Sequence, residues 1–105
     1  MKYNNREEIK ELRLKFCNRI ENLFQPEDII EFNNPFNVYV YEEDMSGSWI
    51  KVPYLVKTLT GGQHFSGINP EGDEFDDLST YDLDDIAEVA YILDMVGDKQ
   101  YKIIQ

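Results

Sequence analysis

Cysteine is almost absent from this sequence, because Cys17 is the only one in 105 residues. A single cysteine excludes an internal disulfide and a cysteine-rich zinc site. Long apolar runs are absent as well: nowhere do about 18 consecutive apolar residues occur, the length that a membrane-spanning helix needs. The opening stretch MKYNNREEIK also lacks the apolar run of a signal peptide. We therefore expect a cytoplasmic protein that does not bind membranes.

Basic residues are scarce, with ten lysines and arginines against 21 acidic residues and a net charge of −11. Direct binding to nucleic acid needs a basic footprint, so this class of partner is not expected. The charge is also uneven: residues 1–24 carry six basic and four acidic side chains, and residues 25–105 carry four and seventeen. The corresponding net charges are +2 and −13. The acidic second part either keeps the protein soluble or docks on a protein with a basic surface.

Signatures of catalysis are missing. His64 is the only histidine and has no partner residue within its segment. Ser66, Ser79 and Thr80 lack the flanking residues of a nucleophile motif. The glycines are not followed by the Gly-Lys-Ser/Thr of a phosphate-binding loop. We therefore expect no enzymatic activity and no cofactor.

The sequence does contain enough apolar residues for one core. Residues of the apolar class make up 42% of the chain, and there are seven tyrosines, six phenylalanines and one tryptophan. A chain of this length is sufficient for one domain and too short for two. We expect residues 1–105 to form a single domain.

The first predicted helix covers roughly residues 5–24. Asn5 and Glu8 have the spacing of a helix N-cap and its reciprocal acceptor. A Gln-Pro pair ends the helix, because proline lacks a backbone donor and restricts the residue before it. Apolar residues recur at spacings of three and four, which predicts a helix packed on the core, with Cys17 and Phe24 at the margin of the apolar face. This face comprises Ile9, Leu12, Phe16, Ile20 and Leu23.

Strands are predicted from residue 36 onward, where the period changes to two. Before them, a short extended stretch or turn of helix ends at Asn33-Asn34-Pro35. A longer strand covers residues 50–57, and Pro53 indicates an edge position or a bulge in it. Gly61-Gly62 predicts a two-residue hairpin, and the next strand needs a bulge at Gly67. A turn over residues 69–72 then leads to a short strand through Phe75.

Tyr39 and Tyr41 form one candidate binding surface. Both point to the side of the first strand opposite Phe36, Val38 and Val40. Tyrosine is enriched at protein–protein contacts because it offers a large area with few rotatable bonds. The alternative is that each of the two faces of the sheet is covered by one helix, in which case both rings are core residues.

The stretch GDEFDDLSTYDLDDIAEVAYIL, residues 72–93, contains eight carboxylates and no basic residue. Its apolar spacing predicts a second helix from Asp82 to about Gly97, capped by Ser79 or Thr80. Carboxylates in a first helical turn interact favourably with the helix dipole. This gives a structural reason for the acidic residues at the helix start, which are Asp82, Asp84 and Asp85.

The acidic residues before that helix have no such reason and form the second candidate binding surface. They do not match a helix-loop-helix calcium site, because the glycine precedes the acidic residues instead of following them. We expect no metal site here and treat these side chains as candidates for binding a basic partner protein. They are Asp73, Glu74, Asp76 and Asp77.

We predict an α+β fold with an N-terminal helix, an antiparallel β-meander of three to five strands, a second helix and a closing strand over residues 99–104. The strand-rich part resembles a small SH3-like barrel with a helix inserted before the last strand, and this resemblance implies no function. The predicted function is a non-enzymatic interaction or regulatory module whose acidic C-terminal half docks on a basic partner. A small-molecule or metal-binding domain is the alternative.

Overall fold

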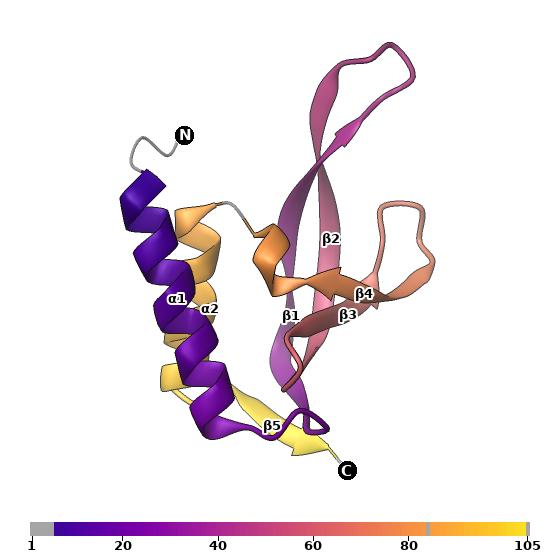
Figure 1. The fold of residues 1–105 in the computed structure, drawn as a ribbon. Coiled ribbons are helices and arrows are strands. Elements are labelled where there is room, and N and C mark those ends of the chain that lie inside the picture. Colours follow the sequence, from indigo (N-terminus) through magenta and orange to yellow (C-terminus); the bar gives the residue numbers. More distant parts are fainter. Residues whose placement is uncertain (1–5, 84, 105) are drawn as a thin grey trace.

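The computed structural model describes residues 6–83 and 85–104 and confirms the predicted α+β fold (Figure 1). Asn5, the predicted N-cap of the first helix, and Asp84 lie outside these ranges. The elements in order are α1 (Arg6–Leu23), β1 (Ile29–Glu43), β2 (Trp49–Thr60), β3 (His64–Ile68), β4 (Glu74–Ser79), the short 3-10 helix η1 (Thr80–Asp82), α2 (Ile86–Gly97) and β5 (Tyr101–Ile104).

The five strands pair antiparallel in the order β4-β3-β2-β1-β5. The strands β4 and β5 are the two edges of this sheet, so the sheet is open. The predicted resemblance to an SH3-like barrel is therefore not confirmed. What is confirmed is the helix at the start and the second helix before the last strand.

The two helices lie side by side on one face of the sheet (Figure 1). The buried side chains of the sheet and those of both helices belong to one hydrophobic core. The opposite face of the sheet, called the outer face below, is covered by neither helix. The fully buried sheet residues are Ile30, Val38, Val56, Leu59 and Phe65.

The buried face of α1 is turned slightly from the predicted one. Leu23 was predicted to lie in the apolar stripe, but its side chain is exposed. The helix ends at Leu23, and Phe24 points inward in its place, with its ring edge-on to Tyr101 at a centroid distance of 5.4 Å. The buried side chains of this segment are Phe16, Cys17, Ile20 and Phe24.

Of the two alternatives predicted before Phe36, the extended stretch is confirmed, but its end at Asn33-Asn34-Pro35 is wrong, because β1 is one long strand. The four residues of β1 between Glu31 and Phe36 face the single Lys57 of β2, so the ladder is irregular there. Pro35 lies in this irregular part, where no regular ladder bond requires the N–H that proline lacks. The preceding residues 29–32 pair with β5 on their other side.

The hairpin at Gly61-Gly62 is confirmed, but its loop has three residues, 61–63, instead of the predicted two. Gly61 is fixed by a close approach, because a Cβ added there would lie 1.8 Å from the backbone oxygen of Gln25. Gln63 takes the left-handed conformation of this turn, with φ of 71°.

The bulge predicted at Gly67 occurs in the neighbours of β3 instead of in β3 itself. Lys57 is the extra residue of β2, between the pairs Val56–Gly67 and Thr58–Ser66. On the other side of β3, two residues of β4 face Ser66 alone. They are Asp76 and Asp77.

The second helix begins later than predicted. Ser79 caps η1 instead of α2, because its hydroxyl oxygen accepts the N–H of Tyr81 at 3.1 Å. Leu83 then has an extended backbone and is buried in the core, which interrupts the helical path. The N-cap of α2 is Asp85, whose carboxylate accepts the N–H of Ala87 at 2.9 Å. Asp82 consequently belongs to η1 and not to the first turn of α2.

The predicted end of the second helix at Gly97 is confirmed. The closing strand is shorter than predicted, since Lys99 has a positive φ of 57° and β5 begins at Tyr101. The N–H of Gln100 bonds back to the carbonyl of Met95 at 2.8 Å, so this turn stays attached to the helix.

Candidate functional site

The distal half of the β1–β2 hairpin projects away from the rest of the molecule (Figure 1). The pairing with β5 ends at Phe32 and the pairing with β3 ends at Leu55, so beyond these positions the hairpin has two strands only. We call residues 39–53 the arm and the remainder of β1 and β2 the base. A hairpin of two strands is at best marginally stable on its own in water.

The arm exposes five large apolar side chains. Tyr39 and Tyr41 are 41% and 50% exposed, because both helices cover the other face of the sheet. The alternative that these rings are core residues is therefore wrong. Met45 at the tip is fully exposed, and Trp49 and Ile50 are 66% and 43% exposed. Tyr39, Tyr41 and Trp49 lie on the outer face, whereas Ile50, which is opposite Glu42, lies on the other face. Exposed apolar side chains gathered on one face are typical of interaction sites.

The tip of the arm is an ordered turn. The carboxylate of Asp44 accepts the backbone N–H groups of Ser46 and Ser48, both at 2.9 Å, and the Ser46 hydroxyl at 2.7 Å. These bonds, the one from the Ser46 hydroxyl most of all, hold the pKa of Asp44 below its usual value. Gly47 supplies the positive φ that the turn requires. The tip therefore presents Met45 from a defined loop.

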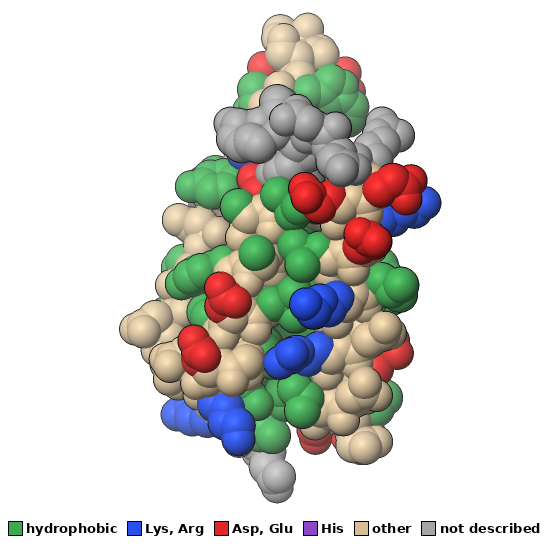
Figure 2. All heavy atoms as spheres, turned by 90° about the vertical axis from the view of Figure 1, so that its left-hand side faces the viewer, with side chains coloured by type: hydrophobic (Ala, Val, Ile, Leu, Met, Phe, Trp, Pro, Cys, Tyr) green, Lys and Arg blue, Asp and Glu red, His purple; other side chains and the backbone are tan. Residues whose placement is uncertain are grey.

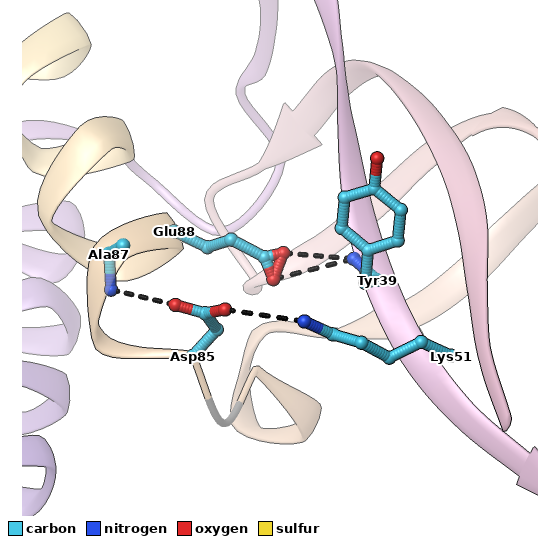
Figure 3. A network of polar contacts seen from close by, with 5 residues as sticks. All are labelled: Tyr39, Lys51, Asp85, Ala87 and Glu88. Atoms are coloured by element: carbon cyan, nitrogen blue, oxygen red, sulfur yellow. Dashed lines mark hydrogen bonds and ion pairs between the residues drawn. The ribbon is translucent and has the colours of Figure 1, made fainter. Parts of the chain in front are cut away.

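The start of α2 meets the arm at its junction with the base (Figure 3). The carboxylate of Glu88 accepts the backbone N–H of Tyr39 at 2.8 Å. Lys51 lies 3.7 Å from the carboxylate of Asp85, and its ammonium is 5.3 Å from the centre of the Tyr39 ring. The first turn of α2 is thus bound to both strands of the hairpin: Glu88 binds the backbone of β1, and Asp85 pairs with Lys51 of β2.

The four acidic candidates lie at the opposite edge of the sheet. Asp73 belongs to the turn between β3 and β4, where the side chain of Asn69 accepts two backbone N–H groups and orders the loop. Glu74, Asp76 and Asp77 belong to the edge strand β4. All four side chains are exposed. In the described part of the chain, no lysine or arginine nitrogen lies within 4.0 Å of their carboxylates.

The structure therefore does not bring the two predicted clusters together. Tyr39 and Tyr41 are on β1, the acidic residues are on β4 and its turn, and β2 and β3 separate them. Tyr54, at the base of the arm, is opposite Val38 and therefore lies on the other face of the sheet from Tyr39 and Tyr41. It donates a hydrogen bond to Glu42 and packs edge-on against Phe75 of β4. The bond to Glu42, with burial and neighbouring carboxylates including Asp77, raises the pKa of Tyr54 to about 12.

A groove of about 710 Å³ runs along the exposed side of α1. Its apolar wall consists of Leu14, Cys17 and Tyr81, and charged side chains of α1 form the rim. The neighbouring Cys17 thiol raises the pKa of Tyr81 through hydrogen bonding to its hydroxyl, and the carbonyl of Tyr81 accepts a hydrogen bond from the guanidinium of Arg13. The volume falls within the range of small-molecule sites.

Charge is distributed unevenly over the helix side as well (Figure 2). In this view, lysine and arginine side chains lie in the middle, at the lower end and at the upper right, and acidic side chains lie toward the top and along the left. Hydrophobic side chains reach the surface between them. Residues 1–24, which carry the positive net charge, include Lys10, Arg13, Lys15 and Arg19 of α1.

Over residues 6–83 and 85–104, no three histidine, cysteine, aspartate or glutamate side chains converge as metal ligands would. No helix in the same residues is long and apolar enough to span a membrane. Comparisons of the chain with protein-family models, curated proteins and solved structures give no match. The arguments on function below rest on the chain's own geometry.

Two residues of the arm and its junction were not predicted as site residues. Met45 belongs to a segment that the sequence marks only as a loop, and loop residues carry no period from which a face can be assigned. Glu88 has no sequence signal for its role, because its partner is the backbone N–H of a residue 49 positions away.

Proposed function

We propose that this protein is a non-enzymatic interaction or regulatory module whose acidic C-terminal half docks on a basic surface of a partner protein. One observation carries the proposal: Asp73, Glu74, Asp76 and Asp77 are exposed on one turn and one edge strand, with no basic side chain of the described residues in ion-pair contact. Their charges are therefore available to a partner. We expect this docking to occur in the cytoplasm and to involve neither nucleic acid nor membrane.

The geometry of β4 supports this proposal. Asp76 and Asp77 both face Ser66, so this edge strand is bulged where its carboxylates are densest. A bulge and charges are also the devices by which edge strands avoid pairing with other chains. Docking and protection of the edge can be told apart by removing the charge. If the carboxylates dock on a partner, their neutralisation abolishes partner binding; if they only protect the edge, no partner is lost.

The test compares two variants that remove the same charge from different surfaces. The first is Asp73→Asn, Glu74→Gln, Asp76→Asn and Asp77→Asn combined. The control neutralises four exposed residues elsewhere, Glu11→Gln, Glu27→Gln, Asp94→Asn and Asp98→Asn. We expect the first variant to lose proteins that the wild type captures from a host lysate, most clearly at low salt, where screening is weakest. The control should still capture them.

Stability provides the second measurement for this pair. Surface substitutions away from specific contacts change the free energy of unfolding by about 0.5 kcal/mol or less. We expect the loop variant to stay within this range or to gain stability from reduced like-charge repulsion. If the loop variant folds normally and captures the same proteins as the wild type, the acidic turn is only a solvated surface and the proposal is wrong.

A small-molecule site is the second candidate function, and the groove beside α1 is the observation that favours it. A ligand there would pack on Leu14 and Tyr81 and meet charged groups at the rim. The binding of small fragments, detected by ligand-observed NMR, should then be lost in the variant Leu14→Arg, which fills the groove. The control Tyr91→Arg alters an exposed residue of α2 and should still bind the same fragments. Equal binding to both variants would exclude the groove.

A further inference from the structure

The edge of β2 that pairs with β3 continues beyond β3 without a partner strand. The ladder between β2 and β3 ends at the pair of Leu55 and Ile68, and among the described residues no strand pairs with this edge over residues 49–54. Figure 1 shows the arm projecting past the end of β3. We call this stretch the free edge of β2. An unpaired strand edge is a template on which another chain can pair.

Two observations show which residues turn their backbone groups toward this free edge. A Cβ added at Gly67 of β3 would lie 1.8 Å from the backbone oxygen of Leu55, so this oxygen lies on the β3 side. On β1, the N–H of Tyr39 is bonded to Glu88 and not to β2, so its pair with Pro53 has no ladder bonds. Because the direction alternates along a strand, both observations assign the same residues of β2 to the free edge, which are Trp49, Lys51 and Pro53.

The free edge of β2 keeps most of its bonding groups. Trp49 and Lys51 each present an N–H and a carbonyl, and Pro53, which has no N–H, presents its carbonyl. Proline and lysine also protect edge strands from pairing. Here the ammonium of Lys51 is directed away from the free edge, since it lies 5.3 Å from the centre of the Tyr39 ring on β1 and 3.7 Å from the Asp85 carboxylate (Figure 3).

The other edge of the arm, on β1, is less open. Both carboxylate oxygens of Glu88 accept the N–H of Tyr39, at 2.8 and 3.3 Å, and α2 begins beside this bond (Figure 3). A strand paired with β1 is therefore limited to the rows of Tyr41 and Glu43 near the tip. A strand paired with β2 continues the line of β3.

Carboxylates gather where the free edge of β2 begins. Glu74 is paired with Ile68, in the last row of the ladder between β2 and β3. The Tyr54 ring lies edge-on to Phe75 of β4 at 5.2 Å and thus leans toward this side. The pKa of Tyr54 is raised mainly by its bond to Glu42 and by burial, and the carboxylates of Glu71 and Asp77 contribute because they lie near its hydroxyl. Among the described residues, no basic side chain forms an ion pair with Glu71, Glu74 or Asp77.

We propose that the partner contributes an extended basic segment that adds to the free edge of β2 as a further strand of the sheet. This inference rests on the proposed function, because it assigns a mode of docking to the same acidic turn and strand. The backbone of the segment bonds to β2, and its lysine or arginine side chains at the base end meet Glu71, Glu74 and Asp77. Its apolar side chains pack beside the exposed ring of Trp49.

A synthetic peptide of four Lys-Val repeats, blocked at both ends, is the probe, and four Glu-Val repeats form the charge-reversed control. Solvent exchange of backbone N–H groups in the full chain is measured by NMR. In the free protein, Trp49 and Lys51 should exchange faster than Val52, whose pair with Val40 carries ladder bonds. The basic peptide should slow exchange at Trp49 and Lys51 about tenfold or more, because their N–H groups become bonded. The acidic peptide should leave both rates unchanged.

Proline variants separate the two edges of the arm. Lys51→Pro should weaken binding of the basic peptide about tenfold or more, because it removes an N–H from the free edge of β2 and its ring obstructs an added strand. Lys51→Ala is the matched control, since it also loses the ion pair with Asp85 but keeps the N–H. Tyr41→Pro places the same change on the opposite residue of β1. Both controls should bind as the wild type does, and circular dichroism checks that each variant is folded.

The outcomes distinguish this inference from the proposed function. Peptide binding that is lost on neutralising Asp73, Glu74, Asp76 and Asp77 but is unaffected by Lys51→Pro shows acidic docking and overturns strand addition. Unchanged exchange at Trp49 and Lys51 in the bound state overturns it as well. Binding that survives the neutralisation but not Lys51→Pro supports strand addition and contradicts docking by the acidic turn. No binding of the basic peptide up to millimolar concentration overturns the inference, whichever proteins the acidic turn captures from a lysate.

Discussion

The base and the arm of the β1–β2 hairpin are built from the same alternation of apolar and polar residues, but only the base is covered. In the base, Val38 and Val56 are fully buried beneath the helices, and further strands pair on both sides. In the arm, Tyr41, Trp49 and Ile50 are exposed, and no third strand pairs with either edge. Alternation thus determines that a segment is a strand, whereas the length of the neighbouring elements determines which part of it is buried.

The largest expected effect separates two isoleucines of this hairpin. Ile30 in the base is fully buried, and Ile50 in the arm is 43% exposed. Ile30→Ala should lower the free energy of unfolding by about 2–5 kcal/mol, because it removes buried methylene and methyl groups and leaves a cavity. Ile50→Ala should cost about 0.5 kcal/mol or less in the monomer. Urea unfolding at low protein concentration measures both, and similar losses would mean that the arm is packed as the base is.

A smaller effect is expected at the junction where α2 meets the arm. Asp85→Ala removes the N-cap bond to Ala87 and the ion pair with Lys51, and should cost about 0.5–2 kcal/mol. Asp82→Ala is the control, since Asp82 belongs to η1 and not to α2. Its effect should stay within about 0.5 kcal/mol. A larger loss for Asp82 than for Asp85 in thermal or urea unfolding would place the helix start where the sequence pattern alone suggested.

The smallest effect is a change of stability with pH at the base of the arm. The pKa of Tyr54 is about 12 in the folded protein, against an ordinary value of 10.0. The folded state therefore holds this proton more tightly than the unfolded state, and the resulting stabilisation is complete below pH 10 and is lost as the pH rises from 10 to about 12.

Substitution of the hydroxyl isolates this contribution. Tyr54→Phe should lose less stability than the wild type between pH 9.5 and about pH 11.5, because the group that titrates there is gone. Tyr91→Phe leaves the bond between Tyr54 and Glu42 in place and should retain the wild-type slope. If both variants have the same slope in urea unfolding, the Tyr54–Glu42 bond does not contribute to the stability of the base.

Much of the fold followed from local patterns. The helix α1, the hairpin at Gly61-Gly62 and the end of α2 at Gly97 are all properties of short segments, and their existence and place were predicted correctly, although Leu23 of α1 is exposed and the hairpin loop has three residues instead of two. The start of α2 was not, because Leu83 fits the apolar spacing of the helix but is buried in the core from an extended backbone. The continuity of β1 through Pro35 was missed because it depends on distant pairing, in which residues 29–31 and 36–43 both pair with β2, one group on each side of the irregular part.

The candidate site was only partly accessible from sequence. Alternation placed Tyr39 and Tyr41 on the correct side of their strand, but whether a helix covered that side depended on the packing of α1 and α2 together on one face. The acidic residues could be identified by composition alone. Their separation from the tyrosines could not, because it follows from the strand order β4-β3-β2-β1.

The position of Trp49 has a consequence for spectroscopy. It is the only tryptophan in the chain, and it lies at the exposed end of the arm, remote from the core. Intrinsic tryptophan emission will therefore begin from a water-exposed indole in the native monomer and shift little when the core unfolds, so a fluorescence melt can miss the main transition that circular dichroism records. The same emission should move to shorter wavelength when another molecule covers the arm, because the indole is then removed from water. Tryptophan fluorescence of the unmodified protein can therefore report contact at that surface.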